Sequence, residues 1–357
     1  MAKATTVKRR TTTTKTKRTT RTTKKTTMIQ PSPSTTVYRR IAKSTTRTTV
    51  KSKGKNTCVL SNVLHVDSDG QKGIFSGTVQ QQQPSFLSNT RSNTKSSGKG
   101  ERKTICTLIH GKLKYKNGNV YLGEFENDVF HGEGVYTTKS SRDVYEGTFI
   151  KGEFTHGKIT YGNGDVYEGQ CKGELAQRHG RGKYRTKQDG SVYEGDWKND
   201  RHDGYGVLKW PNGDEYRGEF RNSNFHGYGK FTYTQDAMKR EYNGEWKEGN
   251  YNGHGKLMFT DNTYYVGQWV DNEMQGHGIG TFHGMEAQEY QGYWEKGECH
   301  GHGTMIYNDG TRYVGMWNRG ERHGHGEITE TDGIRWVGDW HKDEKHGKGV
   351  TYVDVTL

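Results

Sequence analysis

The chain has 357 residues, of which only 28% are hydrophobic, against roughly 45–50% apolar residues, glycine included, in an ordinary globular domain. Glycine accounts for 50 residues, about twice its usual ~7% share, and 22 Tyr, 11 Phe and 8 Trp supply the large side chains. This composition argues against one thick apolar core and favours thin layers with many turns, held together by aromatic rings. No run of about 18 apolar residues is present, so no membrane-spanning helix is expected.

Charge is divided unevenly along the sequence. Residues 1–100 contain 21 Lys and Arg but only Asp67 and Asp69 (about +19), whereas residues 101–357 contain 33 Lys and Arg and 39 Asp and Glu (about −6). The overall charge of +13 therefore comes from a basic arm attached to a mildly acidic body. The cysteines form no CxxC pair, and no apolar segment follows Met1. Both observations favour an intracellular, cytoplasmic protein with reduced thiols.

Residues 1–55 are a basic segment of low complexity, with 19 Thr among the first 50 residues. Such a segment buries too little apolar surface to offset chain entropy, so we expect it to be disordered. Its charge predicts binding to a polyanion, either anionic lipid, an acidic protein surface or nucleic acid; a solubilising tail and a nuclear import signal are the alternatives. The candidate polyanion-binding residues are Lys8, Arg9, Arg10, Lys15, Lys17, Arg18, Arg21, Lys24, Lys25, Arg39 and Arg40.

Residues 56–103 have a mixed composition. The runs NTCVLSNVLHV and GIFSGTVQ are typical of short strands, whereas QQQQP and SNTRSNTKSSGKG are typical of a linker. We therefore expect a linker, with short strands, between the arm and a third region over residues 104–357.

A repeat with a period of about 23 residues begins near residue 109. Each unit opens with a Tyr-x-Gly-x-aromatic core, such as YVGMW at 313–317. About ten residues later comes a small-residue knot such as HGHG at 323–326, and His110-Gly111 is the tail of an incomplete first unit. The residues of the predicted aromatic face are Tyr121, Phe125, Tyr145, Phe149, Tyr167, Tyr193, Trp197, Tyr216, Phe220, Tyr242, Trp246, Tyr265, Trp269, Tyr290, Trp294, Tyr313, Trp317, Trp336 and Trp340.

Each unit is predicted to be a β-hairpin. Tyr313, Gly315 and Trp317 are two residues apart, so they share one face of a strand. Asn-Gly and Asp-Gly pairs, as in KNGN and NDGT, predict tight turns whose two central residues both need positive φ. The knot histidines are expected to mark the other bend of each hairpin. The expected fold is thus all-β, an elongated single-layer antiparallel sheet of stacked hairpins.

The pattern Y-x-G-x-W…H-G-x-G resembles the MORN (membrane occupation and recognition nexus) repeat, over about ten units in residues 109–352. The resemblance implies a curved single-layer sheet with an aromatic groove, used as a scaffold, and family members often dimerise. It also implies association with membrane edges, cytoskeletal assemblies or axonemal radial spokes. Some members are enzymes through a fused lipid kinase or methyltransferase domain, but no segment of this sequence has the size and apolar content of such a domain.

Several units depart from the pattern. Three of them, 167–193, 216–242 and 265–290, carry two or three extra residues, which we expect in turns. The other departures are substitutions: Cys171 for the second aromatic residue, Ile159 for the last knot glycine, Trp336 for the first Tyr, and Asp203, Asn252 and Gln275 for the knot His.

The knot histidines invite a metal hypothesis, because His300 and His302 stand two residues apart. Knots of successive units should lie ~10 Å apart, too far to share an ion, and one unit supplies no third ligand. A structural role, with the ring bonded to turn backbone, is therefore the preferred interpretation. The knot glycines do not form a phosphate-binding loop, because they lack the Walker pattern and a following helix. The acidic residues of the core strands, such as Glu219, are expected on a solvated face of the sheet. We therefore predict no catalytic residue, no metal site and no cofactor.

The sequence thus predicts a non-catalytic scaffold that binds protein partners or its own copy, tethered by the arm to an anionic membrane surface or cytoskeletal structure. The alternatives are a phosphoinositide-binding module and a nucleic-acid-associated protein with a nuclear location. The net charge of −6 on residues 101–357 opposes anionic lipid binding by the sheet itself.

Overall fold

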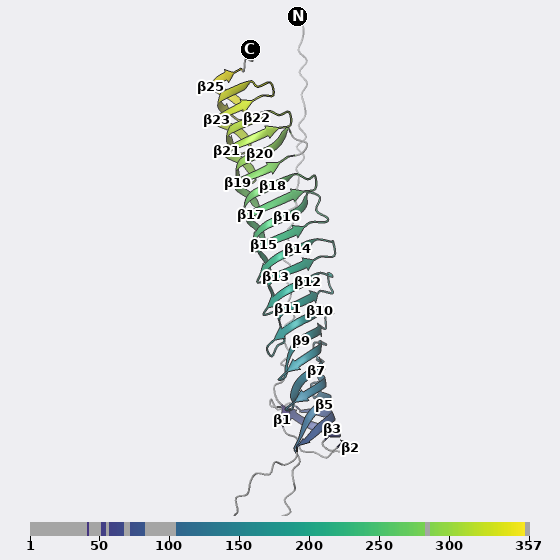
Figure 1. The fold of residues 1–357 in the computed structure, drawn as a ribbon. Helices are drawn as coiled ribbons and strands as arrows, with labels where there is room; N and C mark the ends of the chain where they lie inside the picture. Colours follow the sequence, from purple (N-terminus) through teal and green to yellow (C-terminus); the bar gives the residue numbers. More distant parts are fainter. Residues whose placement is uncertain are drawn as a thin grey trace, which may run out of the picture. The chain divides into compact units, whose positions relative to one another are not determined.

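The computed structural model describes residues 41–42, 51–54, 57–67, 72–82, 105–282 and 286–353. In this part of the chain all regular structure is β, and the strands form one open antiparallel sheet in which hairpins follow one another in chain order (Figure 1). The predicted fold class is confirmed. The arm residues before Ile41, including all the candidate polyanion-binding residues, lie outside the described residues.

The first five strands precede the regular units. β1 and β2 fall inside the segment 1–55, where the composition predicted no stable structure, and they are ordered by pairing along β3. The two short strands predicted between 56 and 103 are present as β3 and β4, and both belong to the same sheet as the repeats. The bounds are β1 (Ile41–Ala42), β2 (Lys51–Gly54), β3 (Thr57–Asp67), β4 (Lys72–Gln82) and β5 (Ile105–Tyr115).

Ten hairpins follow, each made of a core strand that carries the Tyr-x-Gly motif and a knot strand. The core strands are β6 (Val120–Glu126), β8 (Val144–Ile150), β10 (Val166–Lys172), β12 (Val192–Lys198), β14 (Glu215–Arg221), β16 (Lys239–Lys247), β18 (Tyr264–Val270), β20 (Ala287–Glu295), β22 (Arg312–Asn318) and β24 (Arg335–His341). The knot strands are β7 (Val129–Thr137), β9 (Glu153–Thr160), β11 (Gln177–Arg185), β13 (Arg201–Lys209), β15 (Asn224–Thr232), β17 (Asn250–Phe259), β19 (Glu273–Thr281), β21 (Glu298–Tyr307), β23 (Glu321–Thr329) and β25 (Glu344–Tyr352).

The incomplete first unit of the sequence is completed by β4. Gly77 of β4 faces Gly111 of β5, and the Phe75 ring lies against both glycines, as the core Tyr does elsewhere. Val79 occupies the second aromatic position and is fully buried. A divergent unit therefore precedes the ten predicted ones, and its two strands are separated in sequence by residues 83–104.

The bends of the hairpins differ from the prediction. Within a unit the strands are joined by two residues with positive φ, such as Asn127 at 50° and Asp128 at 64°, a pattern that fits the right-handed twist of a hairpin. At the Asn-Gly and Asp-Gly loops only the glycine has positive φ, for example Gly118 at 90°, so the expected pair of positive φ values there is wrong. This loop encloses three residues between Tyr115 and Asn119, one more than the two-residue bend within a unit. The Tyr115 N–H donates to the Asn119 carbonyl across it.

The extra residues of the three long units lie in connecting loops, as predicted. Residues 173–176 replace a two-residue bend between β10 and β11. Residues 233–238 connect β15 to β16, and the third set of extra residues falls between the end of β19 at Thr281 and the start of β20 at Ala287. The loop 233–238 contributes to the pockets described below.

Candidate functional site: the aromatic face

The ring of the core tyrosine fills the space that a side chain at either of two neighbouring glycines would occupy. In the unit that begins at Tyr313, the ring lies over Gly315 of its own strand and Gly326 of the knot strand, and an added Cβ on Gly326 would come within 2.3 Å of the phenol oxygen. The hydroxyl group donates to the Met316 carbonyl at 3.0 Å. Seven other core tyrosines make the same bond to the residue three positions later, so the two glycines are required by the ring.

The second aromatic residue joins each unit to the one before it. The Trp317 indole N–H donates to the Gly303 carbonyl at 3.4 Å, and the ring meets Tyr290 edge-to-face with 5.4 Å between centroids. Five other tryptophans bond to the corresponding glycine of the preceding unit. The rings therefore supply the contacts between neighbouring units as well as the core of each unit.

The residues of the predicted aromatic face are buried in the sheet. Eighteen of the nineteen are no more than 6% exposed, and Trp336 is half-buried. They stabilise the stack, but they offer little surface of their own to a partner. Any contact on this face must therefore use the gaps between rings and the side chains around them.

One position on this face was not predicted from the sequence: the residue directly before the knot. Phe130, Phe225 and Tyr251 each stack on the core Tyr of their own unit, with centroids 3.7–3.8 Å apart. The residue type at this position varies widely among the units, so the sequence did not reveal a common role. Its spacing from the second knot glycine nevertheless places it on the ring face. In the remaining units the position holds Phe154, one residue earlier relative to the knot His, or Arg178, His202, Met274, Cys299, Arg322 and Lys345.

A polar cluster replaces rings around β11 and β13. The Arg178 guanidinium is 8% exposed, donates through Nε to Asp200 at 3.0 Å, and lies 4.5 Å from the Trp197 ring centroid. His202 is buried and stacks on Tyr193 at 3.6 Å. Burial, with a smaller contribution from Arg178, lowers the pKa of His202 to about 3, so this ring is neutral at physiological pH.

The knot lies inside a strand, so the predicted bend at the histidine is wrong. In the β14–β15 pair Gly218 faces Gly229 and Glu219 faces His226, which leaves two knot residues as a bulge. The first knot glycine has positive φ, 56° at Gly227. The Glu219 carboxylate accepts from Tyr228 N–H at 3.1 Å, so an acidic residue expected only on a solvated face stabilises the bulge.

The knot of the second unit is shortened and has not simply lost its last glycine. Gly157 faces Gly147, the place that the last knot glycine takes in other units. Ile159 is buried opposite Tyr145. The bulge there is one residue shorter, and the departure predicted at Ile159 is a deletion.

The histidine and cysteine side chains of the described residues have structural surroundings. No group of three His, Cys, Asp or Glu side chains is placed to hold a metal ion there. The ring of His131 lies 3.1 Å from Glu126, and that of His300 lies 3.5 Å from Glu295, so these rings face a carboxylate and not the turn backbone that was expected. Burial raises the pKa of the Cys171 and Cys299 thiols to about 12, which disfavours the nucleophilic thiolate.

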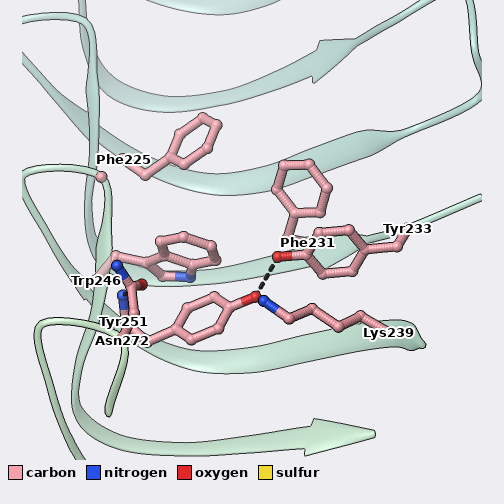
Figure 2. A pocket seen from close by; sticks show the side chains of 8 residues that line it. Phe225, Phe231, Tyr233, Lys239, Trp246, Tyr251 and Asn272 are labelled. Carbon is pink, nitrogen blue, oxygen red and sulfur yellow. Dashed lines mark hydrogen bonds between the residues drawn. The ribbon is translucent and has the colours of Figure 1, made fainter. Parts of the chain in front are cut away.

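Two pockets open on the aromatic face between β15 and β20. The first has a volume of about 340 Å³ and is lined by Phe225, Phe231, Tyr233, Lys239, Trp246, Gly249, Tyr251 and Asn272. Figure 2 shows the Lys239 amine beside the phenol oxygens of Tyr233 and Tyr251, which are hydrogen-bonded to each other. Lys239 Nζ lies 5.4 Å from the Tyr251 ring centroid. The site thus places a cation and two hydroxyl groups within an aromatic wall.

The second pocket, also about 340 Å³, is more apolar. Its lining includes Phe259, Met274, Phe282 and Trp294 from the sheet, and the 69% exposed Met238 from the long loop 233–238. That loop thus contributes to both pockets, through Tyr233 in the first and Met238 in the second.

The described residues contain no helix long and apolar enough to cross a membrane. This stack of β-hairpins, with one aromatic core per unit, defines a β-repeat protein. Nine stretches match the MORN repeat model, at 121–140, 145–166, 193–215, 216–237, 242–264, 265–282, 290–312, 313–335 and 336–354. They cover more than half of the sequence, and the chain belongs to the MORN repeat family. The stretch 167–192, which carries Cys171 and Arg178, is not among them.

No curated protein matches the chain. Among solved structures, it is similar to the TCP10 domain of Danio rerio CPAP in complex with a STIL peptide, at 15% identity and a TM-score of 0.32, covering 68% of this chain and 94% of that one. It is also similar to the SAS-4 TCP domain of Drosophila melanogaster in complex with a proline-rich motif of Ana2, at 14% identity and a TM-score of 0.17, covering 71% and 99%. At these TM-scores the likenesses carry no conclusion about partners.

Proposed function

We propose that the protein is a non-catalytic scaffold whose aromatic face binds other proteins and whose basic arm attaches it to an anionic structure. The main support is the pair of pockets on one face of the sheet, between β15 and β20. Pockets lined by aromatic side chains with a few polar groups are typical of recognition sites. The family is one of repeat scaffolds, and the perturbed thiols and tyrosines of the described residues are explained by burial in the stack.

The arm is the second part of the proposal. Eleven Lys and Arg between Lys8 and Arg40 are the candidate contacts with an anionic membrane surface or an acidic cytoskeletal surface. Each basic residue near an anionic lipid surface contributes about 1 kcal/mol, so the binding should weaken steeply with salt. Phosphorylation of the interspersed threonines would cancel the charge and release the partner.

Replacing these eleven residues by Gln in the full chain tests the arm. In flotation with phosphatidylserine or phosphoinositide vesicles, the unaltered protein should float with the vesicles and the variant should not. Vesicle binding that survives the replacement would favour the alternative that the sheet itself is a phospholipid-binding module. DNA binding lost with the arm, in the absence of vesicle and tubulin binding, would favour the nucleic-acid alternative.

Protein binding by the sheet is tested by co-precipitation from native extract, comparing the full chain with a chain lacking residues 1–40, which keeps every described strand. Partners retained by both forms bind the sheet or the segments within it, and partners lost with the deletion bind the arm. If neither form retains any protein, the scaffold proposal fails. Sedimentation of the purified full chain measures self-association, for which a homodimer is the proposed form, and fluorescence microscopy tests a location at the cytoskeleton or membrane periphery against a nuclear one.

A further inference from the structure

One unit lacks the side chain that fills its core. In each unit a residue of the knot strand pairs with the core Tyr or Trp, and eight of these partners are large and apolar. The partner of Tyr265 is Gly280. The other partners are Tyr136, Ile159, Tyr184, Leu208, Phe231, Leu257, Met305, Ile328 and, opposite Trp336, Thr351.

The second pocket lies at this missing side chain. Gly280 is in its lining, and the Trp294 ring lies so close that a Cβ added at Gly280 would be 2.8 Å from its Cζ2. A volume of about 340 Å³ nevertheless remains between Phe259, Met274 and the loop residue Met238. The volume falls within the range of ~300–1,000 Å³ typical of ligand pockets. An apolar group that enters this space would be covered on several sides by apolar side chains. It would thus take the place that the partner of the core Tyr fills in the other units.

The first pocket supplies a cation whose amine forms no ion pair with the described residues. Lys239 is half-buried between Tyr233 and Tyr251, and Asp236 of the same loop, whose charge reaches both phenol groups, accepts from the Met238 and Lys239 backbone N–H groups. A partly desolvated ammonium group gains most from an opposite charge brought to it. One of the two phenol groups donates to the other, so the remaining hydroxyl hydrogen can donate to that anion. Asp261, the charged residue in the lining of the apolar pocket, already accepts from the Thr263 backbone and hydroxyl groups.

The two pockets lie on the same face, with Lys239 on β16 and Gly280 three strands away on β19. Three strand spacings of ~4.8 Å amount to ~14 Å, and an extended chain advances ~3.3 Å per residue, so about four residues connect the two sites. Resting on the proposed scaffold function, we propose that this face binds an extended segment of a partner protein through one large apolar side chain at Gly280 and one carboxylate side chain at Lys239, about four positions apart. The Gly280 and Lys239 pockets thus determine which segment the scaffold selects.

Selection of random twelve-residue peptides displayed on phage, with the full chain as bait, tests the spacing. We expect enrichment of peptides with Phe, Trp, Leu or Met about four positions from Asp or Glu. A synthetic copy of an enriched peptide, with benzoylphenylalanine at the apolar position, should photo-crosslink to Met238 or Met274. Enriched peptides without an acidic residue, or crosslinks confined to other units, would overturn the proposal.

Two variants separate the pockets. Gly280→Leu introduces the side chain found at Leu208 and Leu257, which fills the pocket directly and by displacing the Trp294 ring, and should weaken peptide binding, measured by fluorescence anisotropy, at least about tenfold. Lys239→Glu should weaken it similarly, and a peptide with Lys in place of its acidic residue should recover binding to this variant. Met305→Leu, at the equivalent position of the next unit, is the matched control and should leave binding unchanged.

Folding is checked by melting each variant, and Met238→Gln provides a second test because its side chain is 69% exposed and can change without disturbing the core. Unchanged affinity in Gly280→Leu, or no recovery by charge exchange, would overturn this inference. If peptides or proteins still bind elsewhere on the sheet, the scaffold function stands without it. If nothing binds the sheet in either assay, the proposed function itself fails.

Discussion

Arg178 and Arg322 occupy the same position in two units and form the same ion pair with the turn of the following unit. In both, Nε donates to the partner Asp Oδ1 at 3.0 Å and a terminal nitrogen donates to the carbonyl of the same residue. They differ in burial, because Arg178 is 8% exposed and Asp200 28%, against 19% for Arg322 and 49% for Asp343.

The difference shows what the repeat can accept. The position before the knot holds a stacked ring in several units, and at Arg178 and Arg322 a guanidinium replaces the ring and pairs with a carboxylate of the next turn. Both guanidinium groups lie over rings, Tyr184 and Trp197 for Arg178 and Trp340 for Arg322. The pair at Arg178 is more deeply buried, and His202 is buried in the next unit, whereas the pair at Arg322 is closer to solvent. The same contacts should therefore stabilise the two regions by different amounts.

The largest expected effect concerns a residue type that both regions use. Trp317→Ala removes a ring that is 4% exposed, its bond to Gly303 and its contacts with Tyr290 and Tyr313. Removing a buried Trp costs about 3–5 kcal/mol. His323→Ala, at a half-buried ring in the next knot, should cost less than about 1 kcal/mol. Thermal unfolding of both variants measures the difference, and equal or reversed shifts in melting temperature would contradict the assignment of cohesion to the rings.

The two ion pairs provide the direct comparison. Asp200→Asn leaves the amide oxygen as an acceptor but removes the charge that balances a buried guanidinium, so we expect a loss of about 2–3 kcal/mol. Asp343→Asn, at the exposed copy, should cost no more than about 1 kcal/mol. Asn272 accepts from a backbone N–H at the same position in another unit, which indicates that the turn itself tolerates the amide. Urea unfolding of the two variants measures both costs, and similar losses would show that burial does not distinguish the pairs.

The buried His202 ring of the polar region should make the stability of the protein depend on pH. The pKa of His202 is lowered from 6.5 to about 3 in the folded protein, so the unfolded chain binds a proton first as the pH falls. Stability should therefore be complete above pH 6.5 and decrease toward pH 3, by about 1.4 kcal/mol per pH unit. His202→Phe, which introduces the ring found at Phe130 and Phe225, should remove this part of the slope. Melting temperatures between pH 7 and pH 4 provide the test, with His346→Phe, at an exposed ring, as the control.

Much of this architecture followed from the sequence, because the Tyr, Gly and Trp of each unit repeat in register with the period-two alternation of a strand. The bends were misplaced because glycine and histidine in the knot were interpreted as a turn, whereas the register shows a bulge within the strand. The unit formed by Phe75 and Gly77 was not recognised, because residues 83–104 separate its strands. The pockets could not be predicted, since they depend on a glycine at 280 and on how the loop 233–238 lies against the sheet.

The smallest expected effect concerns the bulge, which both regions stabilise with different side chains. The Gln170 amide oxygen accepts from Arg181 N–H at 3.1 Å in the polar region, as the Glu219 carboxylate accepts from Tyr228 N–H at 3.1 Å in a regular unit. In these two units the bulge is bonded by a side-chain acceptor, whether neutral or charged, whereas Tyr293 and Met316 hold the position in two other units with the same bulge. Glu219→Gln should change the free energy of unfolding by less than about 0.5 kcal/mol, whereas Glu219→Ala, which leaves Tyr228 N–H to water, should cost about 1 kcal/mol.

Chemical denaturation of the two Glu219 variants separates the acceptor from the charge. A loss in Glu219→Gln as large as that in Glu219→Ala would assign the stabilisation to the carboxylate charge and separate the polar region from the regular units at the bulge as well as in the core. Raising the salt concentration provides the control, because an interaction that depends on an exposed charge weakens with salt and a neutral hydrogen bond does not. The expected insensitivity to salt would mean that, in the units with Gln or Glu at this position, a neutral hydrogen bond to the backbone stabilises the knot and the charge of Glu does not.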